Sequence, residues 1–574
     1  VLISKSDSLN TAGDGGYTAL HFAAAADRAD CIQLLLQNKA SMLIRSSNGT
    51  YPVHVAAKSG AAKALQALIT GAESMGIDHR LLLSLKDKEG QLPIHNAVNN
   101  GAAEVVLVCL NCGSSLLSRK DSGSTPVHYA AKQGNLELLK TMYDFNSETY
   151  KEALQLADIT MRTPLHWASM FDHHQVVKYL IKMSNVNTVD INNQTPLLTA
   201  ATNGCWETLA ILLMHRETNT EFIDKKERNV LHQAVIQKMN LEESFYVWKQ
   251  VRDITQRCNE QDKTGSTPLH YAAWNGRVRD VQALLNLGAN TNVKNKLRQN
   301  PFHIACKNGC YDVCLLLLND KAGSRLKNEQ DDSGDSPLHM AAAKGYTPIV
   351  NILLQRGAII SKSKTMATAL HLAAAGGHIR CVHSLLSVHL DLLDAEDCDG
   401  NTALHLAAAN GHAEAVSLLL SSGAEITYNV FGKCFYDDAL TQEYSRVLDV
   451  CIVHERWQEI LSVFSQYHGQ LILGLITYLP YSCVKALDRC VHASSNDKNS
   501  VDYEVQYNFR YLQLGEEYSA FAKVYKLRCS PLLPVEVNLC VFSRVRRWRI
   551  LMSQTLKIVC YQNSVRFTSI SHFF

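Results

Sequence analysis

A four-residue pattern that recurs along most of this chain restricts its possible folds more than any other feature. The pattern consists of a small polar residue, usually a proline, an apolar residue and a histidine, as at residues 125–128 and 163–166. Twelve clear copies lie 32 to 41 residues apart, and 33 residues is the commonest spacing. A repeat of this length and regularity predicts an array of stacked units, each too small to bury its own apolar face.

Each position of the repeat has a physical role in a pair of helices. The threonine, serine or asparagine can cap a helix by accepting a hydrogen bond from a free N–H group. Eight of the twelve prolines follow it directly, where a helix needs no donor. Aliphatic runs such as residues 315–318 then predict a second helix. Between the two helices, nine copies carry a glycine that can end the first helix in a left-handed conformation: Gly60, Gly101, Gly134, Gly204, Gly276, Gly309, Gly345, Gly377 and Gly411.

This combination of motif, spacing and glycines resembles the ankyrin repeat. With a divergent copy at residues 434–437, the array has about thirteen repeats and occupies residues 1–438. The resemblance implies an all-α solenoid that binds protein partners on its concave face. The least repeat-like parts are insertions, which neutral drift or a function could explain, at about residues 71–84, 146–156, 241–256 and 319–330.

The eleven motif histidines invite a metal-binding or catalytic interpretation. Each occupies the same place in its own repeat, one layer away from the next, which disfavours a shared site. A side-chain hydrogen bond to a neighbouring turn accounts for all of them at once. We therefore expect a structural role for His21, His54, His95, His128, His166, His232, His270, His303, His339, His371 and His405.

Two further groups of side chains resemble metal sites. Asp394, Asp397 and Asp399 precede a glycine as in a calcium loop, but His405 replaces the glutamate that would complete twelve residues. An Asp-Gly turn between repeats is therefore favoured. The cysteines at 109–112 and 306–314 lack a second CxxC pair and are expected to be buried apolar residues. We assign no catalytic, cofactor or metal residues and predict that the chain is not an enzyme.

Composition narrows the class of protein further. The 56 Lys and Arg residues nearly balance the 54 Asp and Glu residues, so no global charge attracts nucleic acid. The longest apolar stretch, at residues 471–479, is about half the length that a membrane helix requires. Seventeen scattered cysteines indicate reduced thiols in the cytoplasm. Because the first residue is Val1, we expect a fragment that lacks its own N-terminus.

The repeat pattern fades after residue 438, and three further segments are expected. Residues 439–498 predict a helical linker, and residues 499–514 have the aromatic, partly alternating pattern of an extended strand. Residues 515–574 form a divergent tail that we expect to be poorly ordered. The basic and aromatic cluster at residues 544–549 leaves contact with anionic lipid as the alternative for this tail.

Four motifs after the repeats resemble the TRPA (ankyrin-type transient receptor potential) cation channels: RWxExL from Arg456, YLP from Tyr478, LDxC from Leu487 and DYxxxYNFxYLQ from Asp502. The resemblance covers about residues 10–514. It implies the cytosolic sensor and assembly region of a tetrameric, non-selective cation channel at the plasma membrane. The linker would precede six membrane helices and a pore, and the chain is expected to stop before them, so that it meets the membrane only through those helices. The alternative is a free-standing adaptor that binds proteins through its ankyrin repeats.

The same resemblance bears on electrophile sensing, which some members of this family perform through reactive linker cysteines. Cys490 matches one family cysteine and is the candidate reactive thiol. Lys485 and Arg489 flank it and could lower its pKa. We predict weak electrophile sensing, with temperature or other cues as the input. The reason is that three other cysteine positions of the family fall on Gln470, Ser500 and Leu514 in this chain. Gln470 stands at the position of the family's main electrophile trap.

Overall fold

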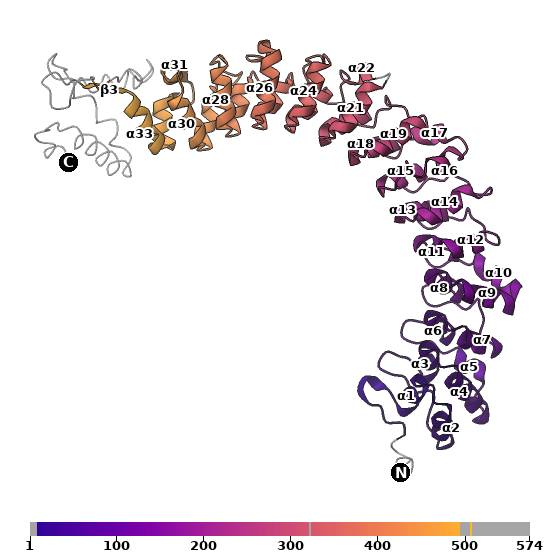
Figure 1. The fold of residues 1–574 in the computed structure, drawn as a ribbon. Coiled ribbons are helices and arrows are strands. Elements are labelled where there is room, and N and C mark those ends of the chain that lie inside the picture. The colour runs from indigo at the N-terminus through magenta and orange to yellow at the C-terminus, as the bar shows by residue number, and fades with distance from the viewer. Residues whose placement is uncertain (1–8, 321–322, 494–504, 508–574) are drawn as a thin grey trace, which may run out of the picture. The chain divides into compact units, whose positions relative to one another are not determined.

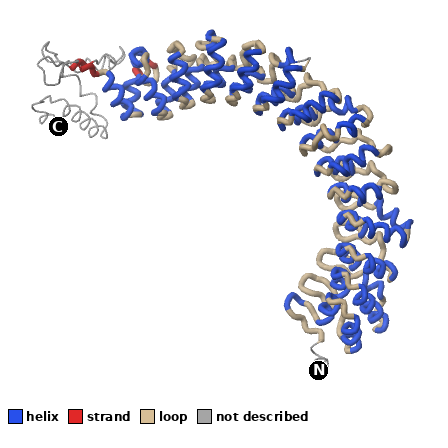
Figure 2. Tube along the Cα trace, in the orientation of Figure 1, coloured by secondary structure: helices blue, strands red, loops and turns tan. Residues whose placement is uncertain are grey.

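The computed structural model describes residues 9–320, 323–493 and 505–507. The chain divides into two compact units, residues 1–454 and residues 455–574, and each is described by itself. The first unit consists of helices joined by turns and loops, and all four described strands belong to the second unit (Figures 1 and 2). The expected all-α repeat array with a short β segment is confirmed.

Thirteen helix pairs build the first unit (Figure 1). The first helix of each pair begins directly after the first residue of the motif, or of its divergent copy. These helices are α1 Ala19–Ala25, α3 Pro52–Ser59, α6 Pro93–Asn100, α8 Pro126–Gln133, α11 Pro164–Met170, α13 Pro196–Asn203, α15 Val230–Ile236, α18 Pro268–Asn275, α20 Pro301–Asn308, α23 Pro337–Ala343, α25 Ala369–Ala375, α27 Ala403–Ala409 and α29 Phe435–Thr441.

The second helices run back alongside the first and carry the aliphatic runs. They are α2 Ala29–Gln37, α4 Ala62–Ser74, α7 Ala103–Asn111, α9 Leu136–Phe145, α12 His174–Leu180, α14 Trp206–Met214, α16 Phe245–Lys249, α19 Val278–Asn286, α21 Tyr311–Asn319, α24 Thr347–Gln355, α26 Ile379–Val388, α28 Ala413–Ser421 and α30 Ser445–Val453. Two short 3-10 turns, η2 Asp14–Gly16 and η3 Leu390–Leu392, also belong to the array.

Local sequence explains where the first helices start and stop. The motif proline stands in the first turn of its helix, as at Pro126 and Pro164, because no N–H donor is needed there. Gly134 follows α8 with φ 71°, a left-handed conformation that suits a residue without a Cβ atom. All nine repeat glycines have positive φ, as the sequence predicts.

The core is a continuous layer of apolar side chains that are buried between neighbouring helix pairs. First helices pack on first helices and second helices on second helices, for example α8 on α11 and α2 on α4. The paired alanines of the first helices, such as Ala130–Ala131, are completely buried, which lets the backbones approach closely. Each repeat therefore depends on its neighbours for burial of its apolar faces.

The insertions form helices instead of open loops. They contain α5 His79–Leu83, α10 Ser147–Gln155, α17 Ile254–Asn259 and α22 Gly323–Leu326, and the short α16 takes the place of a full second helix. Their large side chains are part of the core, since Tyr150 and Trp248 are fully buried. Arg257 in α17 is buried and forms an ion pair with Glu221 at 3.0 Å. These insertions thus extend the packed layer.

Helix pairing continues past the expected boundary at residue 438. The helices α29 and α30 pack on each other, and α30 packs on α28 as a second helix of the array does. In α29, Asp437 occupies the place of the motif histidine, and its Oδ2 atom accepts a hydrogen bond from the Cys434 N–H group at 2.7 Å. A carboxylate thus performs the capping role that the histidine performs elsewhere.

The described part of the second unit contains α31 Trp457–Ser462, α32 Leu471–Tyr478 and α33 Pro480–Arg489. A hairpin of β1 (Phe464–Ser465) and β2 (Gly469–Gln470) joins the first two helices. The strand β3 (Val491–Ala493) pairs antiparallel with β4 (Val505–Tyr507), the only described piece of the expected strand at 499–514. The tail expected at 515–574 lies outside the described residues. Across the described residues, no helix is both long and apolar enough to cross a membrane.

Candidate functional site

Most motif histidines cap their own helix with one ring nitrogen and bind the next repeat with the other. His166 shows the arrangement in α11. Its Nδ1 atom accepts a hydrogen bond from the Thr163 N–H group at 3.1 Å and lies 2.9 Å from the Thr163 hydroxyl. Its Nε2 atom donates to the Gln194 carbonyl of the following repeat at 3.1 Å. One neutral imidazole therefore caps its own helix and holds the next turn.

The same pair of contacts recurs along the array. Ten of the eleven histidines donate from Nε2 to a carbonyl 26 to 37 residues further along the chain. The acceptors are Thr50, Gln91, Ser124, Arg162, Gln194, Ser266, Gln299, Glu329, Ala367 and Asn401. His54 follows a tyrosine in the first motif position, and its Nδ1 atom has no partner among the described residues.

Burial keeps these imidazoles neutral. Desolvation lowers the pKa of the histidines below the ordinary 6.5, and the backbone hydrogen bonds that favour the charged form only partly oppose this. The pKa falls to about 4 for His95, His128, His166, His270 and His303. Since their ring nitrogens are occupied by hydrogen bonds within the array, the geometry supports a structural role. Across the described residues, no group of three or more His, Cys, Asp or Glu side chains is placed to hold a metal ion.

The other candidate metal ligands are also engaged within the fold. The Oδ1 atom of Asp397 accepts from the N–H groups of Asp399 and Asn401 at 2.9 and 2.8 Å, which closes a turn between two repeats. Cys306 and Cys314 are buried between α20 and α21 with their sulfur atoms 3.6 Å apart. Burial raises the pKa of Cys109 to about 12, so this thiol is not ionised at neutral pH.

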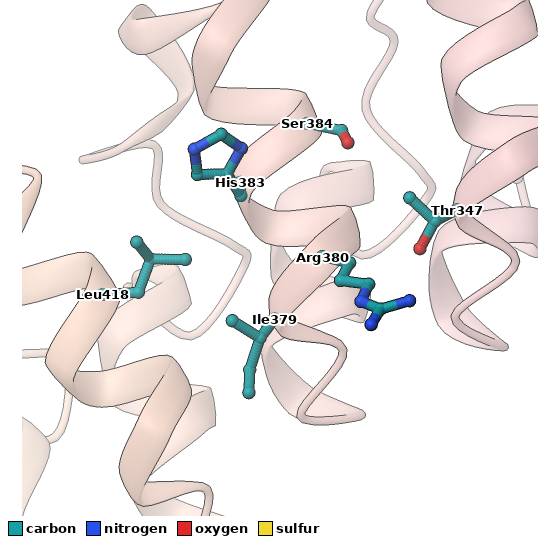
Figure 3. Close-up of a pocket in the computed structure, with 6 residues that line it drawn as sticks. All are labelled: Thr347, Ile379, Arg380, His383, Ser384 and Leu418. Carbon is teal, nitrogen blue, oxygen red and sulfur yellow. The ribbon is translucent and has the colours of Figure 1, made fainter.

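A shallow groove of about 400 Å³ lies on the second-helix side of the array (Figure 3). Residues of α24, α26 and α28 line it, including Thr347, Arg380, His383 and Leu418. Figure 3 shows Arg380 on the side of α26 that faces Thr347, whereas His383 points away from both. No residue that the sequence singles out lies in this groove, and its polar groups converge on no common point.

The motifs of the second unit hold its helices together. In the RWxExL stretch, the Arg456 guanidinium forms a bidentate ion pair with Glu459, with both N–O distances at 2.8 Å. The Arg489 guanidinium lies over the Trp457 ring, 5.2 Å from its centre, and so joins α33 to α31. In the YLP motif, the Tyr478 ring packs edge-on against His468 at 5.2 Å, and Pro480 begins α33. The first and third of the four motifs thus contact each other through Trp457 and Arg489.

The candidate thiol Cys490 is buried at the end of α33, with 4% of its surface exposed. Its Sγ atom donates to the Ala486 carbonyl at 3.3 Å. Desolvation raises the pKa of this thiol. The expectation that Lys485 and Arg489 lower its pKa is wrong, because burial dominates and the Arg489 guanidinium lies over Trp457.

The sequence analysis did not identify two thiols that are exposed in the structure, those of Cys31 and Cys398. Cys31 lies on the surface of α2, and Cys398 lies at the tip of the turn that Asp397 closes. The position of Cys398 in an Asp-Cys-Asp-Gly turn is a signal that could have identified it, because tips of such turns face solvent. Cys31 has no such signal in the sequence.

Comparison with families of known domains identifies the array. The family described as "Ankyrin repeats (3 copies)" matches residues 1–81, 143–223, 212–295, 280–364 and 359–430. The family described as "Ankyrin repeats (many copies)" matches residues 77–130, so that together they cover most of the first unit. The chain belongs to the ankyrin-repeat family.

Beyond the ankyrin repeats themselves, the chain is similar to two proteins named transient receptor potential cation channel subfamily A member 1. It is 34% identical to the Drosophila melanogaster protein over 507 residues, which cover 87% of this chain and 42% of that protein. It is 34% identical to the Homo sapiens protein over 527 residues, which cover 90% of this chain and 47% of that protein. The expected likeness to the TRPA channels is confirmed, and the chain spans less than half the length of these curated relatives.

Other ankyrin-repeat proteins match a smaller part of the chain. Rabankyrin-5 of Mus musculus is 30% identical over 178 residues, which cover 31% of this chain and 14% of that protein. A match of this length is confined to a part of the chain shorter than the array. The two channel subunits therefore share far more of the chain than this ankyrin-repeat protein does.

Proposed function

We propose that this chain serves as the cytosolic sensor and assembly region of a TRPA-like, non-selective cation channel. The extent of the similarity carries the proposal. Because 87% of the 574-residue chain is more than the 454 residues of the first unit, the match to the Drosophila channel extends beyond the repeats. An ankyrin array alone occurs in many proteins, whereas a match that also includes the following segment favours the channel.

In this proposal the repeats at 1–438 detect a partner, heat or strain. The linker at 439–498 and the strand at 499–514 transmit the change to a gate in the membrane helices. Helix α30, which packs as the last second helix of the array, falls within the residue range of this linker. Four copies of the chain assemble on the cytosolic side of the plasma membrane, with protein partners on the concave face. The coupling is mechanical, because each repeat depends on its neighbours for its packed core.

A chimeric channel tests this proposal. Residues 1–514 replace the matching region of the Drosophila channel, and whole-cell currents are recorded together with surface expression. We expect cation currents in response to at least one stimulus that opens the parent channel. A chimera that reaches the cell surface but carries no current would favour the free-standing adaptor instead. A chimera that carries only the array of this chain controls for misfolding.

We propose in addition that electrophiles activate such a channel only weakly. Gln470 stands at the position of the family's main electrophile trap and cannot form a thioether. Cys490 matches a second family position, but its thiol has a raised pKa and 4% exposure, both of which slow reaction with an electrophile. Iodoacetamide labelling followed by mass mapping tests this, and fast, selective labelling of Cys490 would contradict it.

A further inference from the structure

The turns that join successive repeats form a row linked by backbone hydrogen bonds. Five such turns, called tips here, are residues 158–162, 190–194, 224–228, 262–266 and 295–299. One N–H group of each later tip donates to a carbonyl of the tip before: Ile191 to Thr160 at 2.9 Å, Lys225 to Asn192 at 3.2 Å, Lys263 to Lys226 at 2.9 Å and Lys296 to Thr264 at 2.9 Å. Adjacent tips are therefore in direct contact.

The first two tips of this row are apolar. Ile159 and Met161 at the first tip are 69% and 56% exposed, and Ile191 at the second is 53% exposed. Large apolar side chains on three neighbouring turn positions lose favourable burial unless a partner covers them. Exposed apolar residues also occur at other tips, namely Leu297, Met366, Val430 and Phe431, but those of the first two tips directly precede the run of basic tips.

The next three tips are basic. Their exposed cations are Lys225, Lys226, Lys263, Lys296 and Arg298. Among the described residues, none of these five forms an ion pair. Glu227 is the one exposed acid on these three tips.

The aspartates of the basic tips face inward, so they neutralise little of this surface charge. Asp224 and Asp262 are each 5% exposed, and an Oδ1 atom of each accepts two N–H groups of its own turn. The second oxygen of Asp224 pairs with Arg228 at 2.8 Å, and that of Asp262 accepts from the Tyr271 hydroxyl at 2.6 Å. The outward face of the three tips is therefore mainly cationic, with Leu297, which is 57% exposed, as its large apolar side chain.

We propose that this row binds an extended protein segment in which an apolar stretch adjoins an acidic one. Neighbouring repeats are spaced by helix packing at about 10 Å, and a chain in the extended polyproline II conformation advances about 3.1 Å per residue with three residues per turn. A segment lying along the row thus presents every third side chain to successive tips. A peptide with both stretches covers the apolar tips with its apolar residues and pairs its acidic residues with the basic tips. A polyphosphate or nucleic acid would leave the apolar tips in water.

This inference gives the chemistry of a partner for the array and does not depend on the channel function. Its test uses the full chain by itself, so that failure of the chimeric channel and failure of this inference are separate results.

Fluorescence anisotropy with a labelled peptide tests the proposal. The probe has fifteen residues, with leucine at positions 1 and 4, pairs of glutamate at 7–8, 10–11 and 13–14, and serine elsewhere. We expect saturable binding that weakens as sodium chloride rises from 50 to 300 mM. A scrambled peptide of the same composition binds more weakly, because its leucines and glutamates no longer match the order of the tips.

Two triple variants of equal charge provide the control. Lys226→Gln, Lys263→Gln and Lys296→Gln together remove one cation from each basic tip, and we expect the affinity to fall about tenfold, as three exposed charge pairs would give. Lys140→Gln, Lys151→Gln and Lys178→Gln remove three exposed cations from α9, α10 and α12, and the affinity then changes less than about twofold. Circular dichroism checks that both variants keep the helix content of the parent.

Three results would overturn the proposal. The first is no saturable binding of the probe by the parent chain. The second is an equal loss of affinity in the two triple variants. The third is binding to vesicles of phosphatidylcholine with 30% phosphatidylserine when the peptide does not bind, which would assign the row to a membrane surface.

Discussion

At the scale of single residues, a buried imidazole is useful here because it has one donor and one acceptor. In its neutral form, His166 accepts from Thr163 at Nδ1 and donates to Gln194 from Nε2, so that neither nitrogen is left unpaired. A protonated ring would place a second proton against the Thr163 N–H group. Burial therefore selects one protonation state, and the same residue type recurs wherever a repeat needs both bonds.

Replacing one such histidine should destabilise its repeat strongly. His166→Ala leaves the Thr163 N–H group and the Gln194 carbonyl without partners in a buried site, which costs about 3 kcal/mol of local unfolding free energy. Hydrogen exchange of the α11 amides measures this loss. His174→Ala, in the same repeat, is the control, because its partly exposed side-chain contact with Glu207 contributes less than about 1 kcal/mol. Equal protection in the two variants would contradict the linking role.

Thiol reactivity should follow exposure along the chain. Cys31 and Cys398 are exposed, whereas Cys490 is buried and its pKa is raised. We expect iodoacetamide to label the first two well before Cys490 in the folded chain, and all three at similar rates in urea. Time-resolved mass mapping gives the three rates, and the urea sample is the control for differences in detection.

At the scale of elements, the end of most first helices depends on a glycine, and Gly134 shows how such a glycine also lies against the next repeat. Gly134 has φ 71°, and a Cβ atom there would lie 2.4 Å from His173 Nδ1. The His173 side chain is held in place, since its Nε2 atom donates to the Lys132 carbonyl at 2.6 Å. The glycine therefore serves both the local turn and the contact between repeats.

A pair of alanine substitutions separates these two effects. Gly76 also has φ 71° but has nothing within 4 Å of the Cβ position, so Gly76→Ala introduces only the strain of a left-handed residue, about 1 kcal/mol. Gly134→Ala adds the clash with His173, and we expect it to lower the free energy of unfolding by at least about 1 kcal/mol more. Urea denaturation of both variants makes the comparison. Equal losses would show that the contact with His173 is unimportant.

Capping chemistry made most elements predictable from the sequence. The motif threonines, prolines and glycines are local signals, and the helices begin and end where those signals stand. The helices of the insertions were not predicted, because side chains such as Tyr150 and Trp248 become buried only through contacts distant in sequence. The protonation of Cys490 was also mispredicted, since neighbouring charges in the sequence do not reveal burial.

At the scale of the whole molecule, neighbouring repeats stabilise one another. The free energies contributed by single histidines in different repeats therefore add to the stability of the whole array. Five histidines have a pKa of about 4 in the folded chain, against 6.5 when exposed. Their unfolded forms bind protons first as the pH falls. The array is therefore most stable above pH 6.5 with respect to these groups, and it loses stability as the pH falls from 6.5 towards 4.

The size of this acid effect can be measured. At pH 5 each of the five histidines costs about 2 kcal/mol relative to neutral pH, whereas Asp335, whose pKa is raised to about 6, opposes the trend with a single group. We expect the helical signal at 222 nm to melt at markedly lower temperature at pH 5 than at pH 7.5. A melting temperature that stays constant over this range would show that the imidazoles are not buried in their neutral form.

The proposed kinship with TRPA channels rests most directly on the segment after the repeats. Residues 455–514 alone replace the matching segment of the Drosophila channel, which keeps its own ankyrin array, and currents are recorded from cells in which surface expression is verified. We predict that this channel still opens in response to a stimulus that opens its parent, because the proposed function gives the segment the same role in both proteins. A channel that reaches the surface, keeps its tetrameric assembly and never opens would contradict the proposed function.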